Sequence, residues 1–306
     1  MVQMGEANII TSISSYIYGT TRLGDEHIPF EQRVDVAYAA MNAGVWFHTS
    51  RQYGNALELL SVAFDKDRKK VPRLIAKIGG DSMEAFKEDI KRNLDPIGVK
   101  SLDVGQLCMG GDLAQNFAAG GTSLKELRQI RDSGLVKSYV LEVFPWTSQI
   151  ALKALIGGHT KGLVDAFITY LNPLQRFASN ELWDILVEQK QPIIALRTVA
   201  GGPVHRLRDV PGAAWKEYLQ KRAVEVAPIF ERSGISSWTE FCVRFAFSIP
   251  NVIATVGASS KISNLNEFLA AKEKRGPLPQ DVVNELFRLQ RRWSDELDIH
   301  AEPWTM

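Results

Sequence analysis

Cysteine is scarce in this sequence: Cys108 and Cys242 are the only two among 306 residues. Two thiols are too few for a disulfide framework or for a thiolate metal site. No uninterrupted apolar run is long enough to span a bilayer, and no basic segment followed by an apolar one opens the chain. We therefore expect a cytoplasmic protein with no metal centre and no membrane partner.

An excess of one charge is also absent. The chain carries 36 basic and 35 acidic residues, which leave a formal net charge of +1. Proteins that bind nucleic acid normally present a clear positive excess, so nucleic acid is not an expected partner. Hydrophobic residues make up 45% of the chain, which is enough to bury a large core. The sequence leaves the oligomeric state open.

Short apolar runs alternate with amphipathic segments along the whole chain. The runs that predict strands lie at 9–18, 45–49, 73–78, 102–109, 136–144, 164–171, 192–199 and 252–256. The segments with helical spacing of apolar residues lie at 30–42, 56–60, 83–94, 123–133, 148–156, 180–189, 215–232, 238–248, 262–271 and 279–297. Ser82 is the expected cap of the helix at 83–94.

Eight strands that alternate with helices predict an α/β protein, a (β/α)8 TIM barrel that forms a single domain over residues 1–306. A doubly wound open sheet is the alternative, but no Gly-x-Gly-x-x-Gly follows the first strand. The active site of such a barrel lies at the carboxyl ends of its strands. Those ends are unusually polar here: Tyr18, His48, Lys77, Cys108, Glu142, Asn172, Arg197 and Gly257.

Several short motifs follow one another in a recognisable order. Gly19-Thr20 follows the first strand, and the segment at 40–50 reads Ala-Met-Asn-Ala-Gly-Val-Trp-Phe-His-Thr-Ser and leads into Tyr53-Gly54. Further motifs are Ala76-Lys77, the Asn-Pro-Leu at 172–174 and the Val-Gly-Ala-Ser-Ser at 256–260. From about residue 12 to about residue 271 the chain resembles the aldo/keto reductase family, whose fold is the (β/α)8 barrel.

The resemblance implies a catalytic tetrad of aspartate, tyrosine, lysine and histidine. Tyr53 and Lys77 occupy the tyrosine and lysine positions, whereas His48 stands at the aspartate position and Cys108 at the histidine position. A lysine ammonium beside a tyrosine lowers the phenol pKa and makes it a better acid or base. His48 is either an acid/base group or a structural histidine. Cys108 is either a small core residue or a nucleophile activated by a neighbouring cation.

The resemblance also implies a dinucleotide cofactor. A Gly-Ala-Ser-Ser turn before a helix can bind phosphate through backbone N–H groups, and Lys261 could meet the 2′-phosphate of NADP. The nicotinamide contacts are eroded, because Glu142-Val143 replaces the family's Ser-Asn pair. Glu142 is a carboxamide contact, a base for the substrate, or an ion-pair partner of Lys77 or Arg197. The expected cofactor-binding residues are Gly257, Ala258, Ser259, Ser260, Lys261, Asn266, Glu267, Glu142 and Asn172.

These observations predict an aldo/keto reductase-like oxidoreductase that uses NADP(H) on a carbonyl or sugar-like small molecule. Two alternatives remain open. The barrel could perform acid/base chemistry as an isomerase, epimerase or lyase, or it could be a non-catalytic binding protein. Cationic residues near the carboxyl-end loops favour a hydroxylated or anionic substrate: Arg22, Arg51, Arg176, Arg197 and His205.

Overall fold

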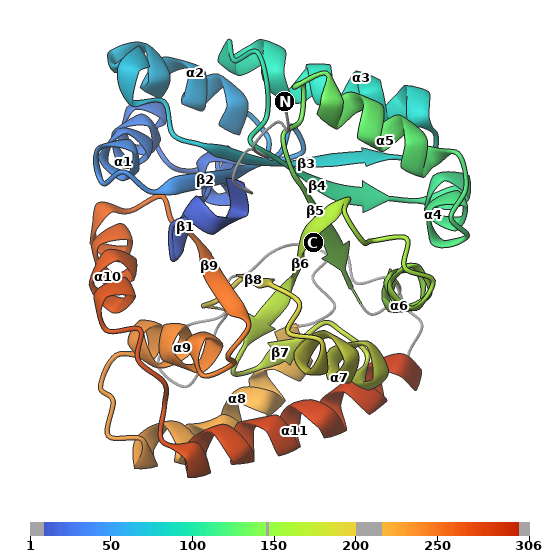
Figure 1. The fold of residues 1–306 in the computed structure, drawn as a ribbon. Helices are drawn as coiled ribbons and strands as arrows, with labels where there is room; N and C mark the ends of the chain where they lie inside the picture. The colour runs from blue at the N-terminus through green and yellow to red at the C-terminus, as the bar shows by residue number, and fades with distance from the viewer. Residues whose placement is uncertain (1–8, 145–146, 200–215, 300–306) are drawn as a thin grey trace, which may run out of the picture. The chain divides into compact units, whose positions relative to one another are not determined.

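The strands and helices of a computed structural model alternate along the chain (Figure 1). The structure describes residues 9–144, 147–199 and 216–299. Hydrogen bonds give the strand order β5-β4-β3-β2-β1-β9-β8-β6-β7, and β5 also pairs with β6. Eight of these strands form the closed parallel sheet of a (β/α)8 barrel, so the predicted fold class is confirmed.

The bounds of the elements agree closely with the alternation in the sequence. The strands are β1 Tyr16–Gly19, β2 Trp46–Thr49, β3 Leu74–Gly80, β4 Val104–Met109, β5 Tyr139–Val143, β6 Val164–Asn172, β7 Gln175–Arg176, β8 Ile193–Leu196 and β9 Val252–Ala258. The α-helices are α1 Phe30–Asn42, α2 Ala56–Lys66, α3 Met83–Leu94, α4 Gly111–Ala118, α5 Ser123–Asp132, α6 Ser148–Ile156, α7 Asn180–Glu188, α8 Lys216–Arg232, α9 Trp238–Phe247, α10 Ile262–Glu273 and α11 Gln280–Ile299.

The chain divides into two units, and the first comprises Met1–Glu142, Ile150–Ile168 and Ala258–Leu265. It contains the parallel neighbours β1 to β4, which are almost entirely buried, as expected for strands covered on both faces. Within this unit α1 packs on α2, and α3 packs on β3 (Figure 1). The register pairs His48 of β2 with Gly19 and Ile75 of the neighbouring strands.

Local sequence signals explain where the helices of this unit begin. Pro29 directly precedes α1, where its fixed backbone angle favours the first turn. The predicted cap of α3 is confirmed, because the hydroxyl of Ser82 accepts a hydrogen bond of 3.2 Å from the backbone N–H of Ala85. Gly44, with φ of +66°, reverses the chain between α1 and β2.

The structure adds β7, a two-residue strand that is antiparallel to β6 and was not predicted, and it makes two further corrections to the predicted element order. Residues Ile9–Ser12 form a turn of 3₁₀ helix instead of the start of the first strand. The hydroxyl of Ser12 donates to the carbonyl of Ile9, a local bond that competes with strand pairing. The second correction is α4, a helix absent from the predicted elements, because the pair Gly110-Gly111 is typical of a strand end and α4 begins at Gly111.

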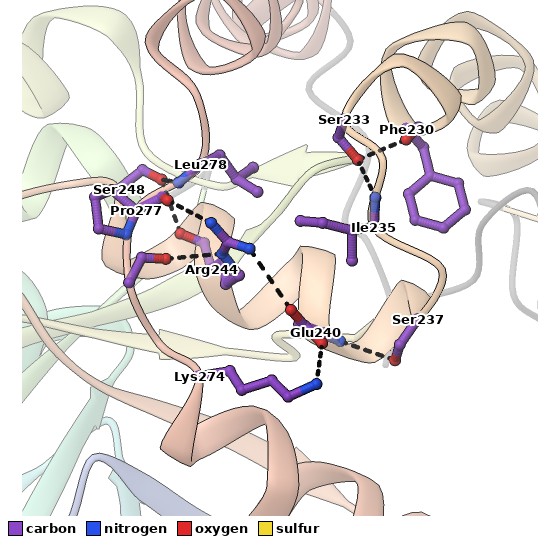
Figure 2. Close-up of polar contacts among 11 residues, drawn as sticks. Phe230, Ser233, Ile235, Ser237, Glu240, Arg244, Ser248, Lys274, Pro277 and Leu278 are labelled. Carbon is purple, nitrogen blue, oxygen red and sulfur yellow. Dashed lines mark hydrogen bonds and ion pairs between the residues drawn. The ribbon is translucent and has the colours of Figure 1, made fainter.

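The second unit comprises Val143–Gln149, Thr169–Gly257 and Asn266–Met306. In it α9 is fixed at both ends (Figure 2). The hydroxyl of Ser237 caps its first turn by accepting from the N–H of Glu240 at 3.2 Å. Near the other end Arg244 donates to the carbonyls of Gly276 and Pro277 at 3.0 and 2.8 Å, which ties the helix to the segment after α10.

Within the described parts of the chain, none of the helices combines the length and the apolar character needed to cross a membrane.

Candidate active site

The carboxylate of Glu142, in the first unit, contacts polar side chains of two neighbouring strands, β3 and β4. The Lys77 Nζ atom lies 3.3 Å from Oε2 of Glu142, and both side chains are largely withdrawn from solvent. Cys108 donates its thiol hydrogen to the same oxygen at 3.2 Å, and the amide nitrogen of Gln106 also donates to it. Gln106 in turn contacts Nε2 of His48, with 2.6 Å between the ring nitrogen and Oε1. Four strands, β2 to β5, therefore contribute to one polar cluster.

Strand geometry accounts for this convergence. Parallel pairing sets Lys77 of β3 directly beside Gln106 of β4. Gln106 and Cys108 are two residues apart on β4, so their side chains leave the strand on the same face. Glu142 lies on β5, the next strand along, which pairs with β4. A polar cluster of this kind follows from register and alternation, without any irregularity of the backbone.

His48 is uncharged at neutral pH. Its side chain is buried, and this burial lowers the pKa from 6.5 to about 4. This value already includes two smaller effects: the hydrogen bond to Gln106 raises the pKa, and the nearby Lys77 ammonium lowers it. The neutral ring can accept or donate a hydrogen bond, but it adds no charge beside the ion pair.

Cys108 behaves as a hydrogen-bond donor. Burial and the adjacent Glu142 carboxylate raise the pKa of its thiol well above the usual value, although Lys77 lowers it in part. A thiol that remains protonated is a weak nucleophile. The environment of Cys108 therefore argues against nucleophilic catalysis and for a structural contact with Glu142.

Tyr53 lies in the turn between β2 and α2. It is half-buried, and its ring centroid is 6.3 Å from that of His48. The turn is held by close backbone contact, since a Cβ atom added to Gly24 would lie 2.1 Å from the carbonyl oxygen of Tyr53. Arg33 fixes the turn from α1 by donating to Asn55 at 2.9 Å. The predicted catalytic residues His48 and Tyr53 thus lie near each other.

A pocket of ≈ 410 Å³ opens beside Lys77 and Cys108. Its lining comes from the ends of β2, β3 and β4 and from α3: Ser50, Arg51, Gln52, Lys77, Gly79, Gly80, Ala85, Glu88, Asp89, Arg92, Cys108 and Gly110. The volume is within the usual range for small-molecule sites. Lys77 is buried and Cys108 partly so, whereas Gln52 and Arg92 are exposed, so the wall runs from the polar cluster out to solvent.

The cationic side chains of the pocket are already paired with carboxylates. Arg51 forms an ion pair with the buried carboxylate of Asp89, and Nε of Arg92 lies 3.2 Å from Glu88. Asp89 also accepts from the backbone N–H of Gly79 at 2.8 Å, so it ties α3 to the end of β3. With Lys77 paired to Glu142, the lining carries no surplus charge.

The other predicted cationic residues are likewise engaged. Arg22 pairs with Asp25 at 3.4 Å, and the guanidinium of Arg197 lies 5.3 Å from the ring centroid of Tyr170. Arg176 is buried and donates to Asn180. His205 lies outside the described residues. The side chains that the structure describes give little support to an anionic substrate.

Four of the predicted cofactor-binding residues, Ala258 to Lys261, are in the first unit. Ser259 and Ser260 are buried, whereas Lys261 is exposed. The Tyr18 hydroxyl donates to the carbonyl of Ser259 at 2.5 Å, and the Ser259 hydroxyl accepts from the N–H of Lys261 at 2.9 Å. The turn before α10 is therefore held in a fixed shape, with the Lys261 side chain turned to solvent.

The remaining predicted cofactor residues have different surroundings. Glu142 is in the polar cluster of the first unit; Gly257, Asn172, Asn266 and Glu267 belong to the second unit. There, Asn172 donates to the carbonyl of Arg197 at 3.0 Å and accepts from the N–H of Leu174 at 2.9 Å.

Glu267 and Gly257 contact residues of neighbouring helices. The Glu267 carboxylate accepts from Thr239 at 3.1 Å, and a Cβ atom on Gly257 would collide with the ring of Phe268. Asn266 is exposed. The contacts of Asn172, Glu267 and Gly257 are therefore contacts within the protein.

Sequence reasoning missed Gln106 and the α3 residues Asp89 and Asn93. Asn93 is fully buried and donates to the backbone carbonyl of Lys77 at 3.1 Å. Gln106 lies within an apolar run, but as a polar residue two positions before Cys108 on the same strand it must share the face of Cys108. The alternation of side chains along the strand was therefore the sequence signal that could have revealed Gln106. No comparable signal in the sequence marks the partners of Asp89 and Asn93.

Comparison with known proteins places the chain in a family. The profile described as Aldo/keto reductase family matches residues 16–291, so the chain belongs to the aldo/keto reductase family. A comparison with curated proteins gives no match. The match to the family profile confirms the predicted resemblance.

Solved structures share the fold. An aldo/keto reductase from Klebsiella pneumoniae in complex with NADP and acetate is 17% identical, with a TM-score of 0.66 over 91% of this chain and 92% of that one. An aldo-keto reductase from the same organism in complex with NADPH is 15% identical, with a TM-score of 0.65 over 91% and 92%. The thermostable aldo-keto reductase Tm1743, in complex with the inhibitor epalrestat, is 16% identical, with a TM-score of 0.66 over 94% and 97%.

Proposed function

We propose that this protein is an NADP(H)-dependent oxidoreductase that interconverts a carbonyl compound and its alcohol. The observation that carries the proposal is the buried Lys77 of β3, which lines the pocket in a chain of the aldo/keto reductase family. Tyr53, close to His48 after β2, is the proposed proton donor to the carbonyl oxygen. Lys77 is the proposed source of positive charge at the reacting group.

For the cofactor we propose NADP(H), which supplies the hydride. The fixed turn at Ala258 to Lys261 before the helix α10 suits a phosphate group, because a helix N-terminus offers backbone N–H groups. The exposed ammonium of Lys261 favours the additional phosphate of NADP over NAD. NADP and NADPH are bound by the two similar proteins from Klebsiella pneumoniae, which supports this choice. Gly257, Asn266, Glu267 and Asn172 remain proposed contacts.

For the substrate we propose an uncharged, hydroxylated carbonyl compound of sugar-like character. The ion pairs of Arg51 and Arg92 leave no unbalanced charge in the pocket for an anion. Hydroxyl groups can use both the donors and the acceptors along such a wall, for example Gln52 and Glu88.

A second candidate function is acid/base chemistry without hydride transfer, as in an isomerase, an epimerase or a lyase. The observation that favours it concerns Glu142, which is a predicted contact of the nicotinamide carboxamide. Its carboxylate is already engaged by Lys77, Gln106 and Cys108 instead. A binding protein without catalysis is the third candidate. Measurements of cofactor binding and of hydride transfer distinguish these three candidate functions.

NADPH titration tests the cofactor part of the proposal. We expect NADPH to change its fluorescence on binding and to raise the melting temperature, since a ligand specific for the folded state stabilises it. Lys261→Ala should weaken NADPH binding about tenfold, equivalent to ~1.4 kcal/mol, and leave NADH binding nearly unchanged. Lys125→Ala, which removes another exposed lysine, is the matched control. No binding of NADPH at millimolar concentration would contradict the proposal.

A further inference from the structure

We propose that Gln106 and Glu142 are positioning residues that fix His48 as the tautomer protonated at Nε2, with Nδ1 left as a hydrogen-bond acceptor in the site. The assignment concerns the protein alone and does not depend on redox chemistry. It follows from the chain of contacts that runs from the ion pair on β5 and β3, through the amide on β4, to the imidazole on β2.

The contacts of Glu142 fix the direction of its hydrogen bonds. Lys77 lies 3.3 Å from Oε2, and an ammonium group pairs with a negative carboxylate. Such a carboxylate can only accept hydrogen bonds. All three of its neighbours are donors, namely the Lys77 ammonium, the Cys108 thiol and the amide NH₂ of Gln106. The amide nitrogen of Gln106 must therefore face Glu142, because the opposite orientation would set its carbonyl oxygen against the carboxylate.

The orientation of the Gln106 amide in turn fixes the proton of His48. Once the nitrogen of the Gln106 amide faces Glu142, its oxygen faces His48, and 2.6 Å separates Oε1 from Nε2. A carbonyl oxygen has no hydrogen to donate, so Nε2 of His48 carries the proton. Because Glu142 is negatively charged, Gln106 turns its oxygen towards His48, and His48 then adopts the tautomer protonated at Nε2.

The imidazole ring of His48 carries no charge. His48 is buried, and burial with the nearby Lys77 holds its pKa at about 4. The ring is therefore neutral under ordinary conditions and carries a single proton. With that proton on Nε2, the Nδ1 atom has a free lone pair that can accept a hydrogen bond or a proton.

This arrangement explains a histidine at a position where the family resemblance predicts aspartate. The carboxylate that balances Lys77 is already supplied by Glu142 from β5. A second carboxylate on β2 would add an unbalanced negative charge to a buried cluster, which is costly. A neutral His48 avoids that cost and still provides an acceptor nitrogen, in a ring whose centroid lies 6.3 Å from that of Tyr53.

The tautomer can be observed directly by NMR. Protein labelled with ¹⁵N-histidine gives long-range ¹H–¹⁵N correlations that distinguish protonated from unprotonated ring nitrogens. His48 is one of five histidines, and His48→Gln identifies its signals. We expect a protonated-type Nε2 and an unprotonated-type Nδ1, unchanged between about pH 8 and about pH 5. A wild-type ring protonated at Nδ1, or a doubly protonated ring in this range, would overturn the assignment.

The role of Glu142 needs a variant. In Glu142→Gln an amide replaces the carboxylate, so Gln106 can turn either way and the His48 signals should shift towards a mixture of tautomers. Glu88→Gln removes an exposed carboxylate of the same pocket and should leave the His48 signals unchanged. A Glu142→Gln spectrum identical to that of the wild type would show that Glu142 does not set the tautomer. The wild-type spectrum tests the tautomer even if this variant fails to fold.

Discussion

Lys77 and Glu142 form the centre of the site at the scale of single residues, and their neighbours follow from that pair. The carboxylate accepts from the Cys108 thiol and from the Gln106 amide, so burial of the charges is accompanied by additional hydrogen bonds. A buried ion pair is tolerated only under such conditions. His48 adds a polar ring to the cluster without adding a charge, since its pKa is lowered to about 4.

Stability should therefore depend on pH through His48. The unfolded chain protonates His48 near 6.5 and the folded protein only near 4, so between these values the unfolded state binds more protons. The free energy of unfolding should fall as the pH is lowered through this window, by between about 2 and about 3 kcal/mol from pH 7 to pH 4.5. His48→Gln should lack this part of the decline in urea unfolding curves. An equal decline in both proteins would contradict the pKa shift.

At the scale of elements, the sequence was most informative where caps and periodicity agreed. The helix predicted at 83–94 has the bounds of α3, and its cap Ser82 is in place. The first strand was less well predicted, because Ser12 closes a local turn that apolar content cannot reveal. Boundaries set by such local hydrogen bonds are difficult to infer from composition.

The turn that carries Tyr53 depends on a close approach to Gly24. A Cβ atom at Gly24 would lie 2.1 Å from the backbone carbonyl oxygen of Tyr53, so the turn must move to accommodate Gly24→Ala. We expect this variant to lose about 1 to 3 kcal/mol of stability. Gly276→Ala is the matched control, because a Cβ there meets nothing within 4 Å. Equal stability of the two variants in chemical denaturation would show that the contact is not tight.

At the scale of the whole molecule, the alternation of strands and helices was sufficient to predict the (β/α)8 barrel. The candidate site was predicted only in part. His48, Lys77 and Cys108 were predicted because each lies at the end of an apolar run, and such runs can be recognised in the sequence. The partner of each side chain was not marked, since the Glu142 carboxylate reaches its neighbours across three strands. Long-range register decides such contacts, and one sequence does not contain it.

The central claim, hydride transfer by a barrel of the aldo/keto reductase family, is tested most directly with NADPH deuterated at the transferred position. Incubation with a panel of uncharged, hydroxylated aldehydes and ketones should give alcohols with deuterium on the former carbonyl carbon. Tyr53→Phe should slow this transfer at least ~100-fold, as expected for loss of a general acid. An unchanged rate in Tyr53→Phe would exclude Tyr53 as the proton donor, whereas substrate that is isomerised without NADPH and takes up deuterium from heavy water would contradict the claim itself.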